Sequence, residues 1–385
     1  MPHKILFIKL GSFSFINDSI LKILQTEFQD HEVDVLDVKD IWKKNMSYFS
    51  YLINIYYFFN EYGLDMIRGH KKWSDLATWF FGTSYMSLKT DQCIRKLVGD
   101  TDYMFTFQTQ TLFNAKLPGK PHFIYTDHTA KANLLYPDIY SSHYMRSARF
   151  IDNVESKIYQ DADITFTCGS LITYSLLNQY NVPKEKALTV SAGSNATDSF
   201  IENNDKYASK NILFVGVDWE RKGGPILIKA FEKVLQKHPD ATLTIIGCNP
   251  ANINLPNCNI LGKLPPGEVA AYYNKAAVFC LPTLREPFGI VFVEAMHYKL
   301  PIIANNIGSI PDMVINDFNG FLIDNDVDGY ADALCKLFDD PLRGKLLGEN
   351  GFDHAQSEFT WELAGKKMKA EIVKYCLPRE TANPQ

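Results

Sequence analysis

The sequence lacks paired cysteines, long apolar runs and an excess of either charge, and each absence excludes a class of protein. Its seven cysteines are odd in number and show no Cys-X-X-Cys spacing, which argues against a disulfide framework and a zinc site. No run of about 18 apolar residues occurs, so we expect no membrane-spanning helix. The net charge of −5 provides no basic field for nucleic acid. What remains is a globular protein, and 385 residues favour at least two domains.

Short apolar runs alternate with helical patterns along the chain. The expected strands are residues 5–10, 31–38, 103–107, 122–126 and 163–167, followed by 211–216, 241–247, 258–262, 277–282 and 301–306. This alternation predicts parallel α/β sheets covered on both faces. The polar stretch 191–210 lacks periodicity and is interpreted as a linker. The predicted fold class is therefore α/β, with two Rossmann-like, doubly wound domains that face each other across a cleft and bind ligand at the carboxyl ends of their strands.

The strongest local signal is the segment REPFGIVFVEAM, residues 285–296. Proline and glycine in this segment predict a turn that leads into a helix beginning near Phe288. The backbone N–H groups of Phe288, Gly289 and Ile290 would then lie at a helix N-terminus, where they have no partner within the helix. A helix N-terminus of this kind binds anions, and a diphosphate is a suitable ligand.

Two glutamates flank this turn. Glu294 lies in an otherwise apolar run, and a carboxylate buried there needs a partner. The two hydroxyls of a ribose would serve, although a neighbouring lysine is the alternative partner. Glu286 precedes the helix at the mouth of the loop, where it could meet the transferred sugar or remain a solvated charge.

A second signal is the segment FVGVDWERKGG, residues 214–224. An expected strand ends at Gly216, and a helix follows the glycine pair, so Arg221 and Lys222 lie in the connecting loop. Two cations beside a helix N-terminus can neutralise a diphosphate leaving group. The alternative is a solvated pair of charges.

A third signal is His128, which follows the expected strand 122–126. It would lie at the carboxyl edge of the first sheet, facing the cleft, with Asp127 available to orient it. A structural histidine at a strand end is the alternative interpretation.

The segment Trp42–Tyr85 differs from the rest of the chain because it is rich in aromatic residues. A basic and aromatic surface can lie on a membrane or hold an amphiphilic acceptor, whereas two core-facing helices are the alternative. Peripheral contact with the inner face of the membrane is thus one interpretation for a protein that we otherwise expect to be cytoplasmic, because the apolar run 5–10 is too short for a signal peptide. The basic residues in question are Lys43, Lys44, Arg68, Lys71 and Lys72.

Together, GVDWERKGG, EPFGIVFVE and NNIGSIPDMVINDFNGFLI resemble the motifs of family 4 glycosyltransferases, which have the GT-B fold. The resemblance is dense over residues 205–365 and sparse before them. It implies retaining transfer of a sugar from a nucleoside diphosphate sugar, UDP- or GDP-linked, with no metal and no cofactor required. The acceptor would be a carbohydrate or lipid-linked hydroxyl.

The resemblance also implies roles for individual residues of the donor site. Lys222 would contact the donor phosphates, Glu294 the ribose and Glu286 the sugar hydroxyls. The backbone at Phe288–Ile290 would bind the diphosphate.

Further roles follow from the same resemblance. Lys263 and Leu264 lie in the loop whose backbone would contact the nucleobase, and Gly11 fits the loop where the first strand approaches the donor. His128 would lie by the reacting sugar and, with Glu286 and Lys222, would form the catalytic set. One departure is Val217, which stands where the family often has an arginine after Gly216.

We therefore expect three regions: an acceptor-side domain over 1–197, a donor domain over 198–365, and a helix over 366–385 that crosses back to the first domain. Two other functions remain open. A non-catalytic sensor or subunit would bind the nucleotide sugar without transferring it, and a nucleotide-sugar epimerase would release an isomerised sugar without an acceptor.

Overall fold

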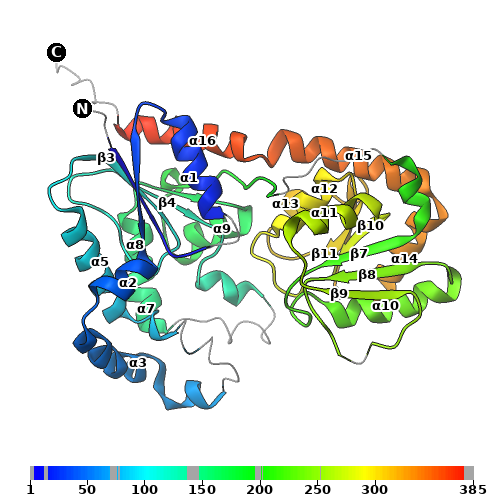
Figure 1. The fold of residues 1–385 in the computed structure, drawn as a ribbon, viewed down its shortest axis with the longest axis horizontal. Coiled ribbons are helices and arrows are strands. Elements are labelled where there is room, and N and C mark those ends of the chain that lie inside the picture. Colours follow the sequence, from blue (N-terminus) through cyan, green and yellow to red (C-terminus); the bar gives the residue numbers. More distant parts are fainter. Residues whose placement is uncertain are drawn as a thin grey trace. The chain divides into compact units, whose positions relative to one another are not determined.

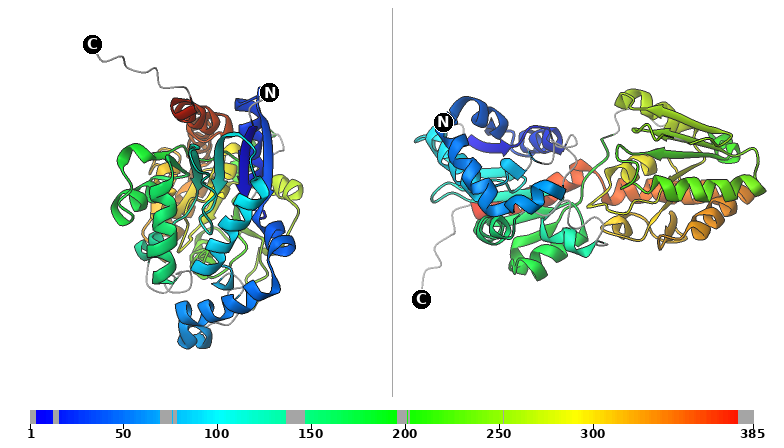
Figure 2. Two further views of the ribbon diagram at one scale, coloured as in Figure 1. Left: turned by 90° about the vertical axis from the view of Figure 1, so that its left-hand side faces the viewer. Right: turned by 90° about the horizontal axis from the view of Figure 1, so that it is seen from below.

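The computed structural model describes residues 4–12, 16–69, 76, 79–136, 147–195, 201, 203–251 and 253–376. The chain divides into two compact units, one comprising Met1–Val190 with Glu362–Gln385 and the other Ser191–Trp361. Each unit is built on one parallel sheet, which in the described residues has six strands. The two units appear in Figures 1 and 2 and are described separately below.

The first sheet has the strand order β2-β1-β3-β4-β5-β6. β1 is buried along its central four residues, because a parallel sheet is covered by helices on both faces and its strands are continuous apolar runs. Aromatic rings of neighbouring strands pack against one another, as Phe123 does against Phe166. The strands are β1 (Lys4–Lys9), β2 (Glu32–Asp37), β3 (Tyr103–Thr109), β4 (His122–Thr126), β5 (Ile164–Thr167) and β6 (Ala187–Thr189).

The helices of the first unit include an extended insertion between β2 and β3. α3 lies at the margin of the unit (Figures 1 and 2). α16 packs against α1, where Lys369 pairs with Glu27 at 3.4 Å. The helical elements are α1 (Ile16–Glu27), α2 (Val38–Asn45), α3 (Tyr48–Gly69), α5 (Ser84–Val98), η1 (Lys131–Leu135), α7 (Ala148–Phe150), the π-helix η3 (Ile151–Glu155), α8 (Ser156–Asp161), α9 (Ser170–Gln179), η4 (Lys184–Lys186) and α16 (Trp361–Cys376).

The second sheet has the strand order β12-β11-β10-β7-β8-β9. From β7 the chain adds β8 and β9 on one side of β7, and it then crosses back to add β10 on the other side of β7. Because strand crossovers are right-handed, this reversal places α10 and α11 on opposite faces (Figure 1). The strands are β7 (Asn211–Val215), β8 (Thr242–Ile246), β9 (Cys258–Gly262), β10 (Val278–Leu281), β11 (Ile302–Asn305) and β12 (Gly320–Ile323).

The helices of the second unit cover this sheet and begin within the expected linker. The polar stretch 191–210 contains a 3-10 helix, η5, in which Tyr207 is buried and donates its hydroxyl to the carbonyl of Lys299 at 2.8 Å. Part of that stretch therefore belongs to the packed unit. The helices are η5 (Asn204–Ser209), α10 (Gly224–Lys237), α11 (Pro266–Lys275), α12 (Ile290–His297), α13 (Ile310–Met313), α14 (Val327–Asp339) and α15 (Pro341–Glu358).

Candidate functional site

The central strands of the second sheet, β7 and β10, form its topological switch point. Chains that leave neighbouring parallel strands in opposite directions open a crevice at their carboxyl ends, where α/β proteins bind ligands. β7 ends before Gly216, and the loop that follows carries Lys222. β10 ends at Leu281, and the loop that follows carries Glu286. Two predicted site residues therefore come from the two strands that flank the crevice.

The loops after β7 and β10 are joined by backbone contacts. Leu284 donates its N–H to the carbonyl of Arg221 at 2.8 Å, and the Thr283 hydroxyl donates to the same carbonyl at 3.3 Å. Gly223 has a φ of +75°, and a Cβ at this position would overlap the carbonyl oxygen of Pro282. Only glycine allows this approach, because it tolerates a positive φ and has no side chain.

The two loops bring Lys222 and Glu286 into an ion pair. Both residues are buried, with 8% and 6% of their surfaces exposed. Burial lowers the pKa of the Lys222 ammonium, and the neighbouring carboxylate of Glu286 opposes that shift. A buried ion pair adds little net stability when its desolvation is counted. Its presence at a switch point, where α/β proteins bind ligands, makes it a candidate for a ligand site.

Arg221 braces the second loop. Its Nη1 donates to the carbonyl of Arg285 at 2.9 Å, and its Nε lies 3.4 Å from a carboxylate oxygen of Asp218. The guanidinium is thus held beside the Lys222–Glu286 pair. Its predicted contact with phosphate stays a prediction.

α12 follows this loop and begins at Ile290, with Gly289 as a cap that supplies no side-chain hydrogen bond. The helix starts two residues later than the predicted start near Phe288, because the turn extends through Gly289. The N–H groups of a first helical turn have no acceptor within the helix. Of the three predicted amides, only that of Ile290 belongs to the first turn of α12, whereas Gly289 caps the helix and Phe288 precedes the cap.

Glu294 lies one turn further along α12 and is half-buried. Its carboxylate accepts a hydrogen bond from the Tyr273 hydroxyl at 3.4 Å. Burial raises the pKa of Glu294 to about 7, an effect that the Tyr273 hydrogen bond opposes. The partner is thus a tyrosine of α11 and not a neighbouring lysine. Tyr273 stacks on Tyr298 at a centroid distance of 5.1 Å, and no local signal in the sequence identified it.

Lys263 and Leu264 lie in the short turn between β9 and α11, at the same carboxyl edge of the sheet. Lys263 is exposed and Leu264 is half-buried. The predicted backbone contacts of this turn with a nucleobase stay a prediction.

The first unit has its own switch point between β1 and β3. Gly11 follows β1 and donates its N–H to a carboxylate oxygen of Asp37 at 2.9 Å. Asn17 donates to the carbonyl of Gly11 at 2.7 Å and accepts from the Thr109 hydroxyl at 2.7 Å. These bonds connect the carboxyl ends of β1, β2 and β3 in one network.

His128 follows β4 at the same edge of the first sheet. Its N–H donates to the Thr126 hydroxyl oxygen at 3.2 Å, and that hydroxyl donates to the carbonyl of His128 at 2.6 Å. The turn is therefore fixed by its own backbone and by the side chain of the last strand residue.

Residues 196–354 match the family model described as glycosyl transferases group 1. This part of the chain is a group 1 glycosyltransferase domain. The family resemblance predicted from the motifs is confirmed. The matched residues contain all of the donor-site candidates except Gly11.

Two curated relatives of this chain come from Corynebacterium. The D-inositol 3-phosphate glycosyltransferase of Corynebacterium aurimucosum is 28% identical over 244 residues, which are 56% of this chain and 58% of that protein. The GDP-mannose-dependent monoacylated alpha-(1-6)-phosphatidylinositol monomannoside mannosyltransferase of Corynebacterium glutamicum is 31% identical over 164 residues, 38% of this chain and 43% of that protein. The chain thus spans less than two thirds of the length of these relatives.

Solved structures resemble the whole chain. A sucrose-phosphate synthase from Thermosynechococcus elongatus has a TM-score of 0.68 at 17% identity and covers 97% of this chain and 98% of its own. The Anabaena protein HepE in complex with UDP-glucose has a TM-score of 0.62 at 14% identity, with 96% and 99% covered. At these identities the likeness concerns the fold, and the predicted α/β, GT-B fold class is confirmed.

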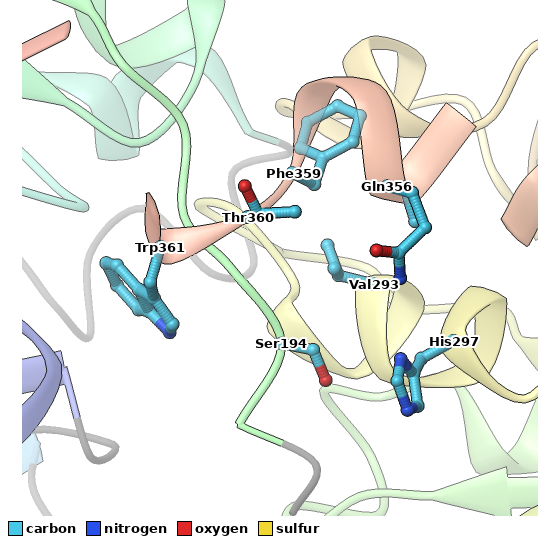
Figure 3. A pocket seen from close by; sticks show the side chains of 8 residues that line it. Ser194, Val293, His297, Gln356, Phe359, Thr360 and Trp361 are labelled. Atoms are coloured by element: carbon cyan, nitrogen blue, oxygen red, sulfur yellow. The ribbon is translucent and has the colours of Figure 1, made fainter. Parts of the chain in front are cut away.

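A separate pocket of about 180 Å³ lies within the second unit, at the far end of α12 from its N-terminus (Figure 3). Val293 and His297 of α12 line it together with residues from the end of α15. None of the predicted donor residues lines this pocket, so it is not the predicted donor site of the glycosyltransferase domain.

Three findings concern the parts of the chain that the structure describes. All seven cysteines are free thiols. No cluster of three His, Cys, Asp or Glu side chains has the arrangement of a metal site among the described residues. Within the same residues, no helix is both long and apolar enough to cross a bilayer.

Proposed function

We propose that this protein is a retaining glycosyltransferase that transfers a sugar from a UDP- or GDP-sugar to a hydroxyl group of a glycan, glycolipid or other carbohydrate acceptor, without a metal ion. The observation that carries the proposal is the buried Lys222–Glu286 pair at the switch point of the second sheet. It lies beside the N-terminus of α12, so cations, amide donors and a carboxylate converge on one place.

The donor would be held by groups of complementary charge. Its diphosphate would accept hydrogen bonds from the amides at Phe288–Ile290 and would attract Lys222 and Arg221. Lys222 would then exchange part of its contact with Glu286 for phosphate, which leaves Glu286 to accept from sugar hydroxyls. Glu294 would accept from the ribose hydroxyls.

In the proposed step, the acceptor oxygen forms a bond to the anomeric carbon on the face from which the diphosphate oxygen departs. The acceptor proton passes to that leaving oxygen, so the sugar keeps its configuration and a nucleoside diphosphate is released. Negative charge grows on the leaving group, and fixed donors and cations are most effective where charge develops. His128 would lie by the reacting sugar.

We also propose that the acceptor is presented at a membrane surface, to which the first unit binds through α3. Large apolar side chains of this helix are exposed, with Tyr48 at 73%. Between Asn45 and Asn60 the sequence contains no charged residue. The exposed set is Tyr48, Phe49, Leu52, Ile53, Ile55, Tyr56 and Phe59.

The inner face of α3 is partly aromatic and partly polar, since Phe58 and Tyr62 pack with Trp79 in one buried cluster. Asn54 is fully buried and donates to the carbonyl of Phe80 at 2.7 Å. Lys43 and Lys44 are exposed at the end of α2, whereas Lys71 and Lys72 lie outside the described residues. An uncharged aromatic face with adjoining lysines fits an anionic lipid surface.

The experiment incubates the protein with UDP-, GDP- and ADP-sugars, with and without a mixed set of acceptors, and measures the free nucleoside diphosphate. Release from one donor, lost in Lys222→Ala and Glu286→Ala, is the expected result. Binding of a donor without release would favour the sensor, and an isomerised donor without acceptor would favour the epimerase. Retained anomeric configuration in the product, with activity unchanged by a chelator, is the expected result for the finer proposal.

A further inference from the structure

One buried carboxyl group joins two loops at the carboxyl edge of the first sheet. Glu155 is 2% exposed and ends the π-helix η3. It accepts from the Thr111 hydroxyl at 3.1 Å, in the loop after β3, and from the Ala130 N–H at 3.3 Å, in the loop after β4. The residues that meet at this carboxyl group are 25 and 44 positions apart from it in the sequence.

Tyrosines extend this network further into the β4 loop. The Tyr180 hydroxyl donates to Glu155 and accepts from the Lys131 N–H at 3.1 Å. The Tyr159 hydroxyl donates to the carbonyl of His128 at 3.3 Å. Burial, followed by the charge of Glu155, raises the pKa of Tyr180 well above its ordinary range, so its hydroxyl remains a hydrogen-bond donor.

Fold stability alone does not account for a carboxyl group at this position. A buried charge is costly to desolvate, and apolar replacements of buried charged groups are often as stable or more stable. The π-helix that places Glu155 is itself a rare distortion that occurs frequently at functional sites. We therefore expect this network to hold the two loops in place, in addition to filling the core.

Each of the two loops carries a polar residue at the edge where ligands bind. His128 lies in the second loop. Gln110 lies in the first and adopts a φ of +67°, which is unusual for a residue other than glycine and accompanies functional sites. Its Oε1 is buried and has no hydrogen-bond partner among the residues that the structure describes. β3 and β4 are neighbours in the sheet, so both loops lie at the edge where parallel sheets bind ligands.

We propose that Glu155 is a positioning residue that clamps the β3 and β4 loops, so that Gln110 and His128 hold one geometry toward the acceptor hydroxyl and the transferred sugar. This inference rests on the proposed transferase function. Glu155 itself touches neither substrate and acts through the two loops.

The test compares three variants with the wild type. Glu155→Gln keeps the shape of the side chain but replaces one acceptor oxygen with a donor, and Tyr180→Phe removes only a hydroxyl. Ile158→Val removes one buried methyl group from α8 in the same part of the core and serves as the matched control for a loss of stability. Steady-state kinetics, nucleoside diphosphate affinity, thermal midpoint and amide hydrogen exchange of peptides covering 108–116 and 126–136 are measured for each.

We expect Glu155→Gln to lower kcat at least tenfold with unchanged nucleoside diphosphate affinity, and to accelerate exchange in both peptides. Tyr180→Phe should show a smaller change, chiefly in 126–136, and Ile158→Val should show neither. Exchange in Glu155→Gln equal to that of the wild type or of Ile158→Val would overturn the clamp. If Glu155→Gln does not fold, Tyr180→Phe decides by the same measurements. If the wild type transfers no sugar, the proposed function fails, whereas the exchange comparison still decides the clamp.

Discussion

The two sheets have the same number of described strands and the same parallel sense, yet they differ in how the chain fills one edge. Counted from its first strand, the second sheet has the order 3-2-1-4-5-6, which is that of a dinucleotide-binding sheet. The first has the order 2-1-3-4-5-6. The second unit adds the edge strand β9 next to β8. At the corresponding point, the first unit adds no further edge strand and instead inserts α2, α3 and α5 between β2 and β3.

This difference separates the parts of the proposed reaction. The family match and all of the donor-site candidates except Gly11 lie in the unit with the standard strand order. The exposed face of α3 and the Glu155 network lie in the unit that departs from it. A common nucleotide-sugar sheet combined with a remodelled acceptor sheet is what we expect where one donor chemistry serves different acceptors.

The largest expected effect is in the second unit. Lys222→Met should lower transfer about 10³-fold, because it removes a fixed cation from the developing charge of the leaving group. The measurement is the initial rate of nucleoside diphosphate release. Lys233→Met, which removes an exposed lysine paired with Asp328, is the control and should retain full activity.

A double variant separates catalysis from folding in the same experiment. Lys222→Met leaves Glu286 buried without its ion pair, which destabilises the unit, whereas Lys222→Met with Glu286→Leu replaces the pair by apolar groups. The double variant should recover the thermal midpoint and remain inactive. Recovery of activity together with stability would mean that the pair is only structural.

A second prediction compares one glycine from each unit. Gly223→Ala should destabilise the protein by about 3 kcal/mol, because the new methyl group meets a backbone carbonyl at a positive φ. Gly11→Ala also has a positive φ but meets only the end of the flexible Lys39 side chain, so about 1 kcal/mol is expected. Denaturant unfolding measures both, and equal losses would contradict the comparison.

The sequence predicted the central strands and the edge strands β2 and β9, but it missed the two shorter edge strands. β1 and β4 are continuous apolar runs because they are buried on both faces, and the predicted ranges lie within one residue of the observed ones. β6 and β12 were missed. They are edge strands of only three and four residues and are partly exposed, so their apolar signal is weak.

The site shows a similar division. Lys222, Glu286 and the N-terminus of α12 each carry a local motif and were predicted individually. Their pairing was not predicted, because it depends on how closely Gly223 approaches Pro282 from another strand. Glu155 and Tyr273 carry no local signal at all, since their partners are distant in the sequence and only the fold brings them together.

A third prediction concerns the exposed face of α3. The double variant Phe49→Ser/Tyr56→Ser should bind vesicles of phosphatidylcholine and phosphatidylglycerol about tenfold more weakly than the wild type, because two large apolar side chains no longer enter the lipid surface. Co-sedimentation measures the binding. Leu342→Ser changes a 79% exposed residue of the other unit and should have no effect.

Vesicles of phosphatidylcholine alone should bind the wild type more weakly, since Lys43 and Lys44 then meet no anionic lipid. If the wild type is instead a dimer by light scattering, and the α3 variant is a monomer with unchanged vesicle binding, the face is covered by a second copy and the lipid proposal is wrong.

The smallest predicted effect compares how two buried carboxyl groups change stability with pH: Glu294 of the second unit and Asp91 of the first. Burial raises the pKa of Glu294 to about 7 and that of Asp91 to about 7. The folded protein therefore binds more protons than the unfolded chain between about pH 4.5 and 7, and the cost of burying the charge grows as pH rises through that window. Glu294→Gln and Asp91→Asn should each raise the stability at pH 8 by on the order of 1 kcal/mol relative to the wild type, and change it little at pH 5.

Only Glu294→Gln should weaken nucleoside diphosphate binding at pH 8, about tenfold, because a carboxylate is the stronger acceptor for ribose hydroxyls. Thermal midpoints at both pH values and calorimetric titration test this. If Asp91→Asn weakens binding as much as Glu294→Gln does, loss of affinity reflects general loosening of the protein, and Glu294 has no place in the donor site.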